Sequence, residues 1–224
     1  MKLARWVAVL AAPLLLNSCL LTPGKFVSTL DIKADRSFTF TYVGEAILIE
    51  PSISAAPDSV DESAADEDAD TPKPDTPEMV AERRAVADAL AREQGYRAAE
   101  YLGGGRFRVD YAMSGRLDRN FLYPFNSDAE AIFPWVAIEL RKDGTARIKA
   151  PAFGDGEAGP NAGPLNPLND AAKHREGSFT LTTDAELVMH NNEQGMAPGQ
   201  GKTVVWTVAP TSKTVPTAVV RFAD

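Results

Sequence analysis

Cys19 is the only cysteine among the 224 residues, and it follows a short apolar run with a basic start. Lys2 and Arg5 precede the run, which covers residues 6–16, and the small residue Ser18 stands directly before the cysteine. Eleven residues are too few to cross a bilayer as a helix, which needs about 20. Residues 1–18 are therefore interpreted as a cleaved export signal. With one cysteine, no disulfide can hold the remaining chain together.

A cysteine directly after the small residue of such a signal resembles the lipobox of bacterial lipoproteins. The resemblance implies that the Cys19 thiol carries diacylglycerol, that palmitate or a similar acyl chain is added, and that Cys19 begins the mature protein. Several chains are needed because one gives only marginal membrane affinity. Leu20 directly follows the cysteine. In the Gram-negative lipoproteins that this pattern resembles, an aspartate at that position favours retention of the protein in the inner membrane. The expected location is the cell envelope, at the outer membrane and facing the periplasm. The alternative for Cys19 is an ordinary buried thiol.

The length and charge of the mature chain narrow its class. Removal of 18 of the 224 residues leaves 206, enough for one sizeable domain or two small ones. Of the net charge of −8, residues 51–75 carry −7, because eight acidic side chains there face Lys73 alone. This stretch has no aromatic residue and is predicted to be a disordered acidic linker. No basic stripe remains to neutralise phosphates, so nucleic acid is excluded as a partner.

The first folded segment is predicted to be a β-hairpin within residues 19–50. Residues 26–33 alternate in polarity, a turn follows, and residues 37–49 alternate again. The second strand places three aromatic side chains on one face: Phe38, Phe40 and Tyr42. Gly44 is expected to mark a bulge or bend.

A helix is predicted over residues 76–94. Thr76 is a candidate N-cap, Pro77 suits the first helical position, and Gly95 is placed to end the helix. Four residues fall at helical spacing on one face: Met79, Arg83, Val86 and Leu90. This narrow, alanine-rich face is expected to pack on a sheet.

Strand patterns occupy the rest of residues 76–224. They cover residues 96–102, 106–117, 132–141, 145–150, 177–183, 185–190, 203–208 and 218–222. The Asp143-Gly144 pair predicts a tight hairpin, and residues 153–175 and 191–202 are expected to be loops. The predicted fold class is α+β, a largely antiparallel sheet with one packed helix and a disordered acidic insertion. The N-terminal hairpin is expected to share one core with the C-terminal strands.

Two stretches approach ligand-binding motifs without matching them. Residues 195–203 end like a phosphate-binding loop, but the first glycine is one position early and a strand rather than a helix follows. Residues 66–77 lack the glycine and the glutamate of a calcium loop at the required positions. Neither nucleotide, metal nor another cofactor is therefore expected, and residues 191–202 are interpreted as a flexible hairpin loop.

Catalytic residues are sparse. His174 and His190 are the only histidines, and no zinc-protease or serine-hydrolase motif accompanies them. Asp110 and Glu139 are a candidate carboxylate pair, although they lie on different strands. The chain is therefore predicted not to be an enzyme. The alternative is an envelope hydrolase whose site is assembled in space around one of the histidines.

Aromatic side chains suggest a binding role instead. Eight of them fall in predicted strands: Phe38, Phe40, Tyr42, Phe107, Tyr111, Phe133, Trp135 and Trp206. Such a set forms either a core or an apolar cleft under a curved sheet. The leading hypothesis is a non-enzymatic envelope module that binds an apolar envelope molecule or a protein partner, with unknown ligand residues and Cys19 as its lipidation site.

Two further resemblances are confined to short stretches. Residues 21–26, together with the hairpin that follows, resemble uncharacterised alphaproteobacterial lipoproteins. Asn191-Asn192, the glycine-rich loop and residues 203–207 are similar to the LppM-like lipoproteins of mycobacteria. The second resemblance implies an antiparallel sheet with a helix and an affinity for lipid or glycolipid.

Overall fold

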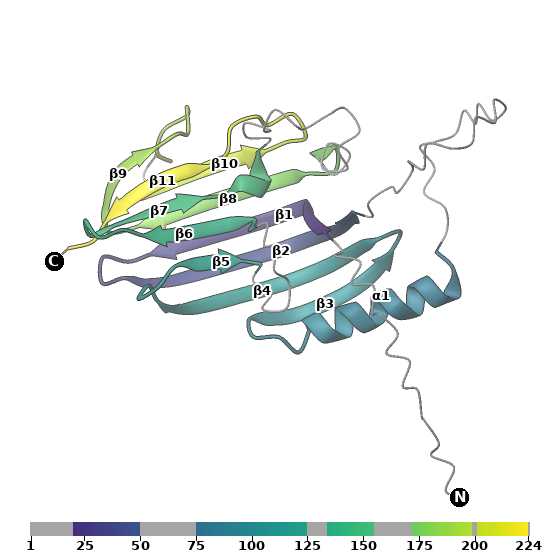
Figure 1. Cartoon of the computed structure of the whole chain (residues 1–224). Coiled ribbons are helices and arrows are strands. Elements are labelled where there is room, and N and C mark those ends of the chain that lie inside the picture. The colour runs from purple at the N-terminus through teal and green to yellow at the C-terminus, as the bar shows by residue number, and fades with distance from the viewer. Residues whose placement is uncertain (1–19, 50–74, 125–133, 155–171, 199–200, 224) are drawn as a thin grey trace, which may run out of the picture.

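Two β-sheets pack face to face, and one α-helix lies beside the second sheet on the same face of the first (Figure 1). The computed structural model describes residues 20–49, 75–124, 134–154, 172–198 and 201–223. The export signal, most of the acidic segment and most of the predicted 153–175 loop lie outside these residues. The predicted α+β class, a largely antiparallel sheet structure with one packed helix, is confirmed.

The first sheet has six strands in the order β10-β8-β1-β2-β4-β3. Its strands are β1 (Leu20–Ile32), β2 (Ser37–Ile49), β3 (Tyr96–Gly103), β4 (Arg106–Arg116), β8 (Glu176–Thr183) and β10 (Lys202–Val208). All neighbours are antiparallel except β1 and β8, which run parallel from the Lys25–Glu176 pair to the Ile32–Thr183 pair. This parallel pairing joins the N-terminal hairpin to the C-terminal strands, and buried residues of both belong to one hydrophobic cluster.

The second sheet has five antiparallel strands in the order β5-β6-β7-β11-β9. These strands are β5 (Phe121–Tyr123), β6 (Val136–Leu140), β7 (Thr145–Lys149), β9 (Glu186–His190) and β11 (Thr217–Arg221). A short 3-10 turn, η1 (Pro151–Phe153), follows β7. The predicted Asp143-Gly144 turn joins β6 to β7, with Gly144 at φ +78°.

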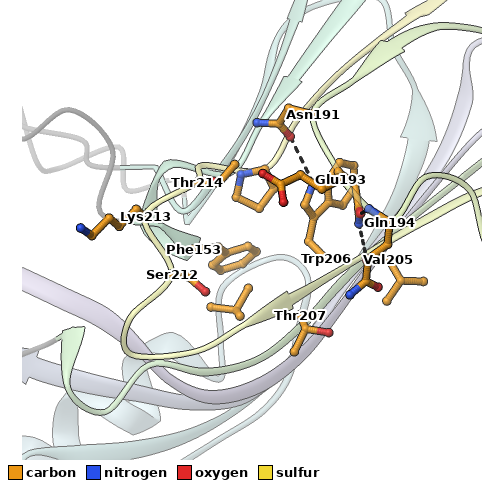
Figure 2. Close-up of a pocket in the computed structure, with 13 residues that line it drawn as sticks. Phe153, Asn191, Glu193, Gln194, Val205, Trp206, Thr207, Ser212, Lys213 and Thr214 are labelled. Carbon is orange, nitrogen blue, oxygen red and sulfur yellow. Dashed lines mark hydrogen bonds between the residues drawn. The ribbon is translucent and has the colours of Figure 1, made fainter.

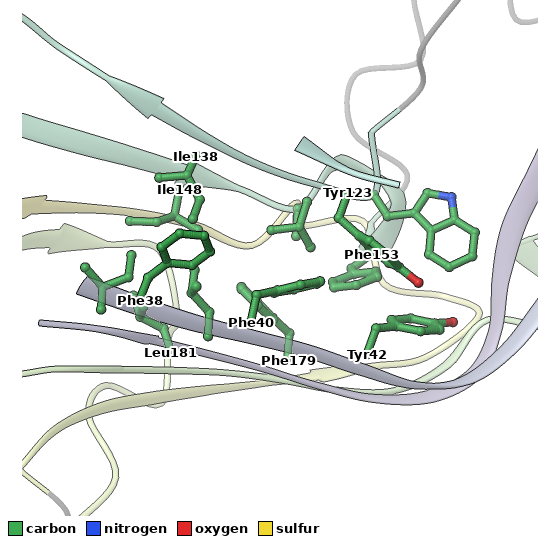
Figure 3. Packing of buried hydrophobic residues seen from close by; sticks show 14 of the residues in the cluster. Phe38, Phe40, Tyr42, Tyr123, Ile138, Ile148, Phe153, Phe179 and Leu181 are labelled. Carbon is green, nitrogen blue, oxygen red and sulfur yellow. The ribbon is translucent and has the colours of Figure 1, made fainter. Parts of the chain in front are cut away.

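Aromatic rings fill the space between the two sheets (Figure 3). The Phe40 ring of β2 is fully buried, and its centroid lies 5.0 Å from that of Tyr123 and 5.4 Å from that of Phe121 in β5. Tyr42 lies 5.0 Å from Trp135 and donates a hydrogen bond of 2.7 Å to the Glu45 carbonyl. Burial raises the pKa of Tyr42 well above its usual value, so this hydroxyl stays neutral. The predicted aromatic face of β2 is thus the centre of the core.

A second run of rings connects the core to the C-terminal strands. Phe153 of η1 stacks on Phe26 at 4.3 Å and lies 5.6 Å from Phe179 of β8. Phe179 in turn stacks on Trp206 of β10 at 5.6 Å. The two runs make the core continuous across the first sheet.

A bulge lies opposite the region of Gly44, but the extra residue is in β1 and not in β2, where it was expected. The register of β1 against β2 shifts between Pro23 and Phe26, opposite Glu45 and next to Gly44. A Cβ at Gly44 would lie 2.4 Å from the Lys25 carbonyl oxygen and 2.5 Å from the Phe26 Cβ. Only glycine allows the strands to approach this closely.

Helix α1 (Pro77–Leu90) begins as predicted and ends earlier. Thr76 is the N-cap, its hydroxyl accepts a hydrogen bond from the Met79 amide, and Pro77 is the first helical residue. The prediction that the helix reaches residue 94 was wrong, because turns occupy residues 91–95 up to Gly95, whose φ is +95°. Val86, expected on the buried face, is 41% exposed.

The buried helix residues are instead Arg83 and Ala87. Their face packs on β3, where Arg83 lies over the Tyr101 ring at 5.8 Å. Tyr101 faces the core, with its ring 5.1 Å from that of Phe107 in β4. The helix therefore covers the part of the first sheet that the second sheet does not reach.

Two strand starts differ from the sequence prediction by more than one residue, and one strand was not predicted. β1 begins at Leu20 rather than Phe26, because the bulge accommodates Pro23 and Gly24 within the strand. β6 begins at Val136 rather than residue 132, and Phe133 lies outside the described residues. The three-residue strand β5 was not predicted at all, since it is too short for an alternating pattern to be visible.

The position of Phe40 yields a stability prediction. Phe40→Ala should lower the free energy of unfolding by about 3–5 kcal/mol, because it leaves a cavity between the sheets. Val43→Ala is the matched control, since Val43 lies on the same strand with 47% of its surface exposed. Urea unfolding of the mature chain measures both changes. An equal, small effect of the two substitutions would contradict the core described above.

Candidate functional site

The predicted lipidation site lies directly before the first strand. Cys19 is outside the described residues, and β1 begins at the next residue. Leu20 pairs with Ile49 at the end of β2, and Leu21 pairs with Leu48. Neighbouring Cα atoms are about 3.8 Å apart, so no linker separates Cys19 from the sheet. An acyl group on Cys19 would therefore be attached at one end of the domain.

The end of the acidic segment is fixed at the same end of the sheet. The Asp75 carboxylate accepts hydrogen bonds from Arg83 and from the Tyr101 hydroxyl, and a third, of 2.9 Å, from the Gly104 amide. The Tyr101 hydroxyl accepts from Arg83 at 2.9 Å and from the Gly105 amide at 3.0 Å. Asp75, assigned from the sequence to the disordered linker, thus belongs to the folded domain.

The turn that binds Asp75 also contacts the end of β2. The Leu48 amide donates a hydrogen bond of 2.8 Å to the Gly105 carbonyl. Gly105 is next to Gly104, whose amide binds Asp75. Leu48 and Asp75, near the two described ends of the segment, therefore lie beside the same turn. Residues 51–74 lie outside the described residues.

A small open pocket of about 230 Å³ lies near the ends of β9 and β10 (Figure 2). Its lining comes from η1, from the residues that follow β9, from β10 and from the segment before β11. The lining residues are Phe153, Asn191, Asn192, Glu193, Gln194, Val205, Trp206, Thr207, Val208, Ser212, Lys213, Thr214 and Pro216. The pocket is thus formed by β10 of the first sheet and by segments that flank strands of the second sheet.

Asn191 holds these segments together. Its side-chain oxygen accepts hydrogen bonds from the Trp206 indole at 3.1 Å and from the Thr217 amide at 2.9 Å. Its side-chain amide nitrogen donates a hydrogen bond of 2.7 Å to the Val215 carbonyl. The side-chain amide of Asn192 donates a hydrogen bond of 2.6 Å to the Val205 carbonyl. The two asparagines therefore build the pocket wall.

Glu193 supplies charge to the pocket. Figure 2 shows its carboxylate beside Trp206, whereas the Lys213 ammonium group extends away to one side. No ion pair joins Glu193 to another residue in the described part of the chain. Trp206 is 6% exposed and rests on Phe179. The site offers a carboxylate next to the edge of an aromatic ring.

The histidines do not come together. His174 is exposed just before β8, and His190 is half-buried at the end of β9; neither is among the residues that line the pocket. The His190 Nδ1 atom is buried without a hydrogen-bond partner in the described structure. Among the described residues, no hydrogen bond or ion pair joins either histidine to a carboxylate or hydroxyl side chain.

The candidate carboxylates lie on different sheets. Asp110 of β4 pairs with Arg97 of β3 at 2.6 Å, and exposed Glu139 of β6 stands opposite Arg147 of β7. Each carboxylate thus has its own arginine neighbour.

Two other interpretations are corrected. Strands β9 and β10 do not form a hairpin with each other, because they belong to different sheets. Met196 instead bridges to Val204. The predicted aromatic side chains of β2 and β4 are buried in the core, and of the predicted set only Trp206 lines the pocket. The aromatic set is a core rather than a cleft.

The described residues were also compared with the needs of metal binding and membrane crossing. They contain no cluster of three or more histidine, cysteine, aspartate or glutamate side chains that could hold a metal ion. Within the same ranges, no helix combines the length and apolar character that a membrane span requires.

Sequence reasoning missed the structural roles of Arg83 and Asn191. Arg83 carried a visible signal, since it is the one charged residue among the four at helical spacing on the predicted buried face. Asn191 carried none, because its three hydrogen-bond partners come from segments up to 26 residues away.

Comparison with known proteins found a similarity to a solved structure. No protein-family model matches the chain, and no curated protein matches it. The structure is similar to the NMR structure of the folded domain of LppM from Mycobacterium tuberculosis. The identity is 14%, the match covers 91% of this chain and 92% of that chain, and the TM-score is 0.38.

The Asp75 network predicts a pH-dependent contribution to stability. The Tyr101 hydroxyl, the Gly104 amide and Arg83 lower the pKa of Asp75 below its usual value. Its contribution should be complete above the unfolded pKa of about 3.9 and should disappear as the pH falls through the lower folded pKa. Asp75→Asn should therefore destabilise the mature chain at pH 7 and have less effect near pH 3.

Urea unfolding at the two pH values measures this difference. Asp118→Asn is the control, because the Asp118 carboxylate is 65% exposed beside Arg119. An Asp75→Asn effect that is the same at both pH values would show that the charge of Asp75 does not stabilise the fold.

Proposed function

We propose that this chain is a lipoprotein of the bacterial cell envelope, anchored through acylated Cys19 and facing the periplasm from the outer membrane. Its folded domain acts as a non-enzymatic binding module for a protein partner. The observation that carries the proposal is the single cysteine at the end of an export signal, directly followed by the first strand. An acylated Cys19 needs no other membrane anchor.

The pocket supports a polar occupant of side-chain size. Small-molecule sites usually enclose about 300–1,000 Å³ and are mostly apolar, whereas this pocket encloses about 230 Å³ and has polar as well as apolar residues in its lining. The Glu193 carboxylate is exposed and favours a cationic group. A lysine or arginine side chain of a partner protein meets these requirements.

An apolar envelope molecule is a weaker candidate. The aromatic rings that could receive it are enclosed between the sheets: Phe40, Tyr42 and Phe107 are at most 1% exposed. Entry of an acyl chain there would require the sheets to separate. The protein partner is therefore the occupant that we propose.

The anchor is tested by Cys19→Ser. The substitution should leave the precursor uncleaved and abolish its incorporation of radiolabelled palmitate, because the acylated thiol is lost. Mass spectrometry of the wild-type N-terminal peptide should find a diacylglyceryl group on Cys19. Normal processing of the Cys19→Ser variant without lipid would refute the anchor.

The partner site is tested by photo-crosslinking in cells. A photoreactive residue at Thr207, exposed at the pocket, should form a protein adduct that Glu193→Lys removes. The same residue at Thr39, exposed on the outer face of β2, should not form that adduct. Glu139→Lys, a charge reversal outside the pocket, should leave the Thr207 adduct intact. An adduct insensitive to Glu193→Lys, or equal at both positions, would contradict the proposal.

A further inference from the structure

One end of the first sheet lacks charged side chains over three neighbouring segments. They are residues 20–24 of β1, residues 46–49 of β2 and residues 102–105 at the turn from β3 to β4, and we call them the apolar tip. Backbone pairs join them: Leu20 with Ile49, and the Leu48 amide with the Gly105 carbonyl. In a chain with 24% charged residues, an uncharged strand end of this size is unusual.

Part of the apolar tip faces solvent. Leu102 is 40% exposed, and Leu21, Leu48 and Ile49 are only partly buried. The Glu45 carboxylate lies beside Gly24, and the Asp75 carboxylate, 8% exposed, is paired with Arg83 at the turn from β3 to β4. Two exposed cations flank the tip: Lys25 follows residue 24, and Arg106 is the first residue of β4. A long cationic side chain can extend to lipid headgroups while its methylenes contact apolar groups.

We infer that the apolar tip docks into the interfacial region of the lipid bilayer to which Cys19 is attached. This inference rests on the proposed acylation, because Cys19 immediately precedes the first residue of the tip. The anchor brings the tip to the bilayer surface without a linker. Partly buried leucine and isoleucine side chains then gain burial in the interface, as apolar residues of interfacial proteins do. The domain stands with β1 rising from the membrane.

The opposite end of the domain gives a natural reference point. The turn between β6 and β7 lies there, since the Phe222 amide binds the Gly144 carbonyl and Arg36, in the turn from β1 to β2, covers the Phe222 ring. The 13-residue strand β1 spans about 40 Å at roughly 3.3 Å per residue. Arg106 at the tip and Lys142 at the far turn are both exposed cations beside glycine turns.

The test uses acylated full-length protein in phosphatidylcholine vesicles that contain a nitroxide-labelled lipid. A fluorophore is attached to Arg106→Cys or Lys142→Cys, and it reacts only there because acylation occupies the Cys19 thiol. The label at residue 106 should be quenched and blue-shifted, and the label at residue 142 should behave as in water. Neutral lipid is chosen because the acidic residues of 51–74 begin just beyond Ile49. Equal quenching at the two positions would overturn the inference.

A spacer separates true docking from tethering. Twelve glycine and serine residues between Cys19 and Leu20 would give the domain a reach of roughly 20 Å. If the tip binds the bilayer, the label at residue 106 stays quenched in the protein with the spacer. In that protein, Leu102→Asp should lower the ratio of docked to undocked domains by roughly tenfold. Val188→Asp is the matched control, since Val188 is 41% exposed on β9. A label released by the spacer alone, or equal effects of both aspartates, would refute docking.

A final experiment distinguishes failure of the proposed acylation from failure of the proposed docking. Mass spectrometry reports acylation of Cys19 directly, so its absence refutes the anchor and not the tip. The mature Cys19→Ser chain is then mixed with an excess of the same vesicles. Docking requires a bound fraction that Leu102→Asp lowers and Val188→Asp does not. No difference between these two variants refutes docking whether or not Cys19 is acylated.

Discussion

The contact between the aromatic face of β2 and the strands β5 and β6 is the interaction on which the fold depends. Phe40 and Tyr42 are fully buried beneath Tyr123 and Trp135. A two-stranded hairpin cannot bury such rings by itself, so the hairpin requires a second layer. That layer is the second sheet, and the parallel β1–β8 pairing brings the C-terminal strands to it.

The same end of the first sheet collects three connections of the chain. Cys19 precedes β1 there, β2 ends there at Ile49, and Asp75 lies beside the turn between β3 and β4. Arg83 and Tyr101 bind the Asp75 carboxylate, so the charge that ends the acidic segment is neutralised within the domain. A long acidic segment can therefore start and end beside an uncharged tip without separating the strands.

The pocket depends on rigid supports rather than on the residues that would meet a partner. Asn191 uses both side-chain polar atoms to fix β10, β11 and the segment between them. Trp206 is held from below by Phe179 and from the side by Asn191. Glu193 projects from this frame with its carboxylate unpaired among the described residues. A fixed frame with one adaptable charged group suits recognition of a partner side chain.

The sequence by itself determined the α+β class, nearly all strand positions, the helix start at Thr76 and Pro77, and a bulge near Gly44. These features depend on local patterns: alternation, capping and the close approach that only glycine permits. Only the tertiary structure decided that the strands form two sheets, that β1 runs parallel to β8, and that Arg83 rather than Val86 faces the core. It also decided the pocket, because the bonds of Asn191 join segments far apart in the chain. Local patterns show which face of a strand is apolar, but the partner that covers the face is chosen by packing across the whole molecule.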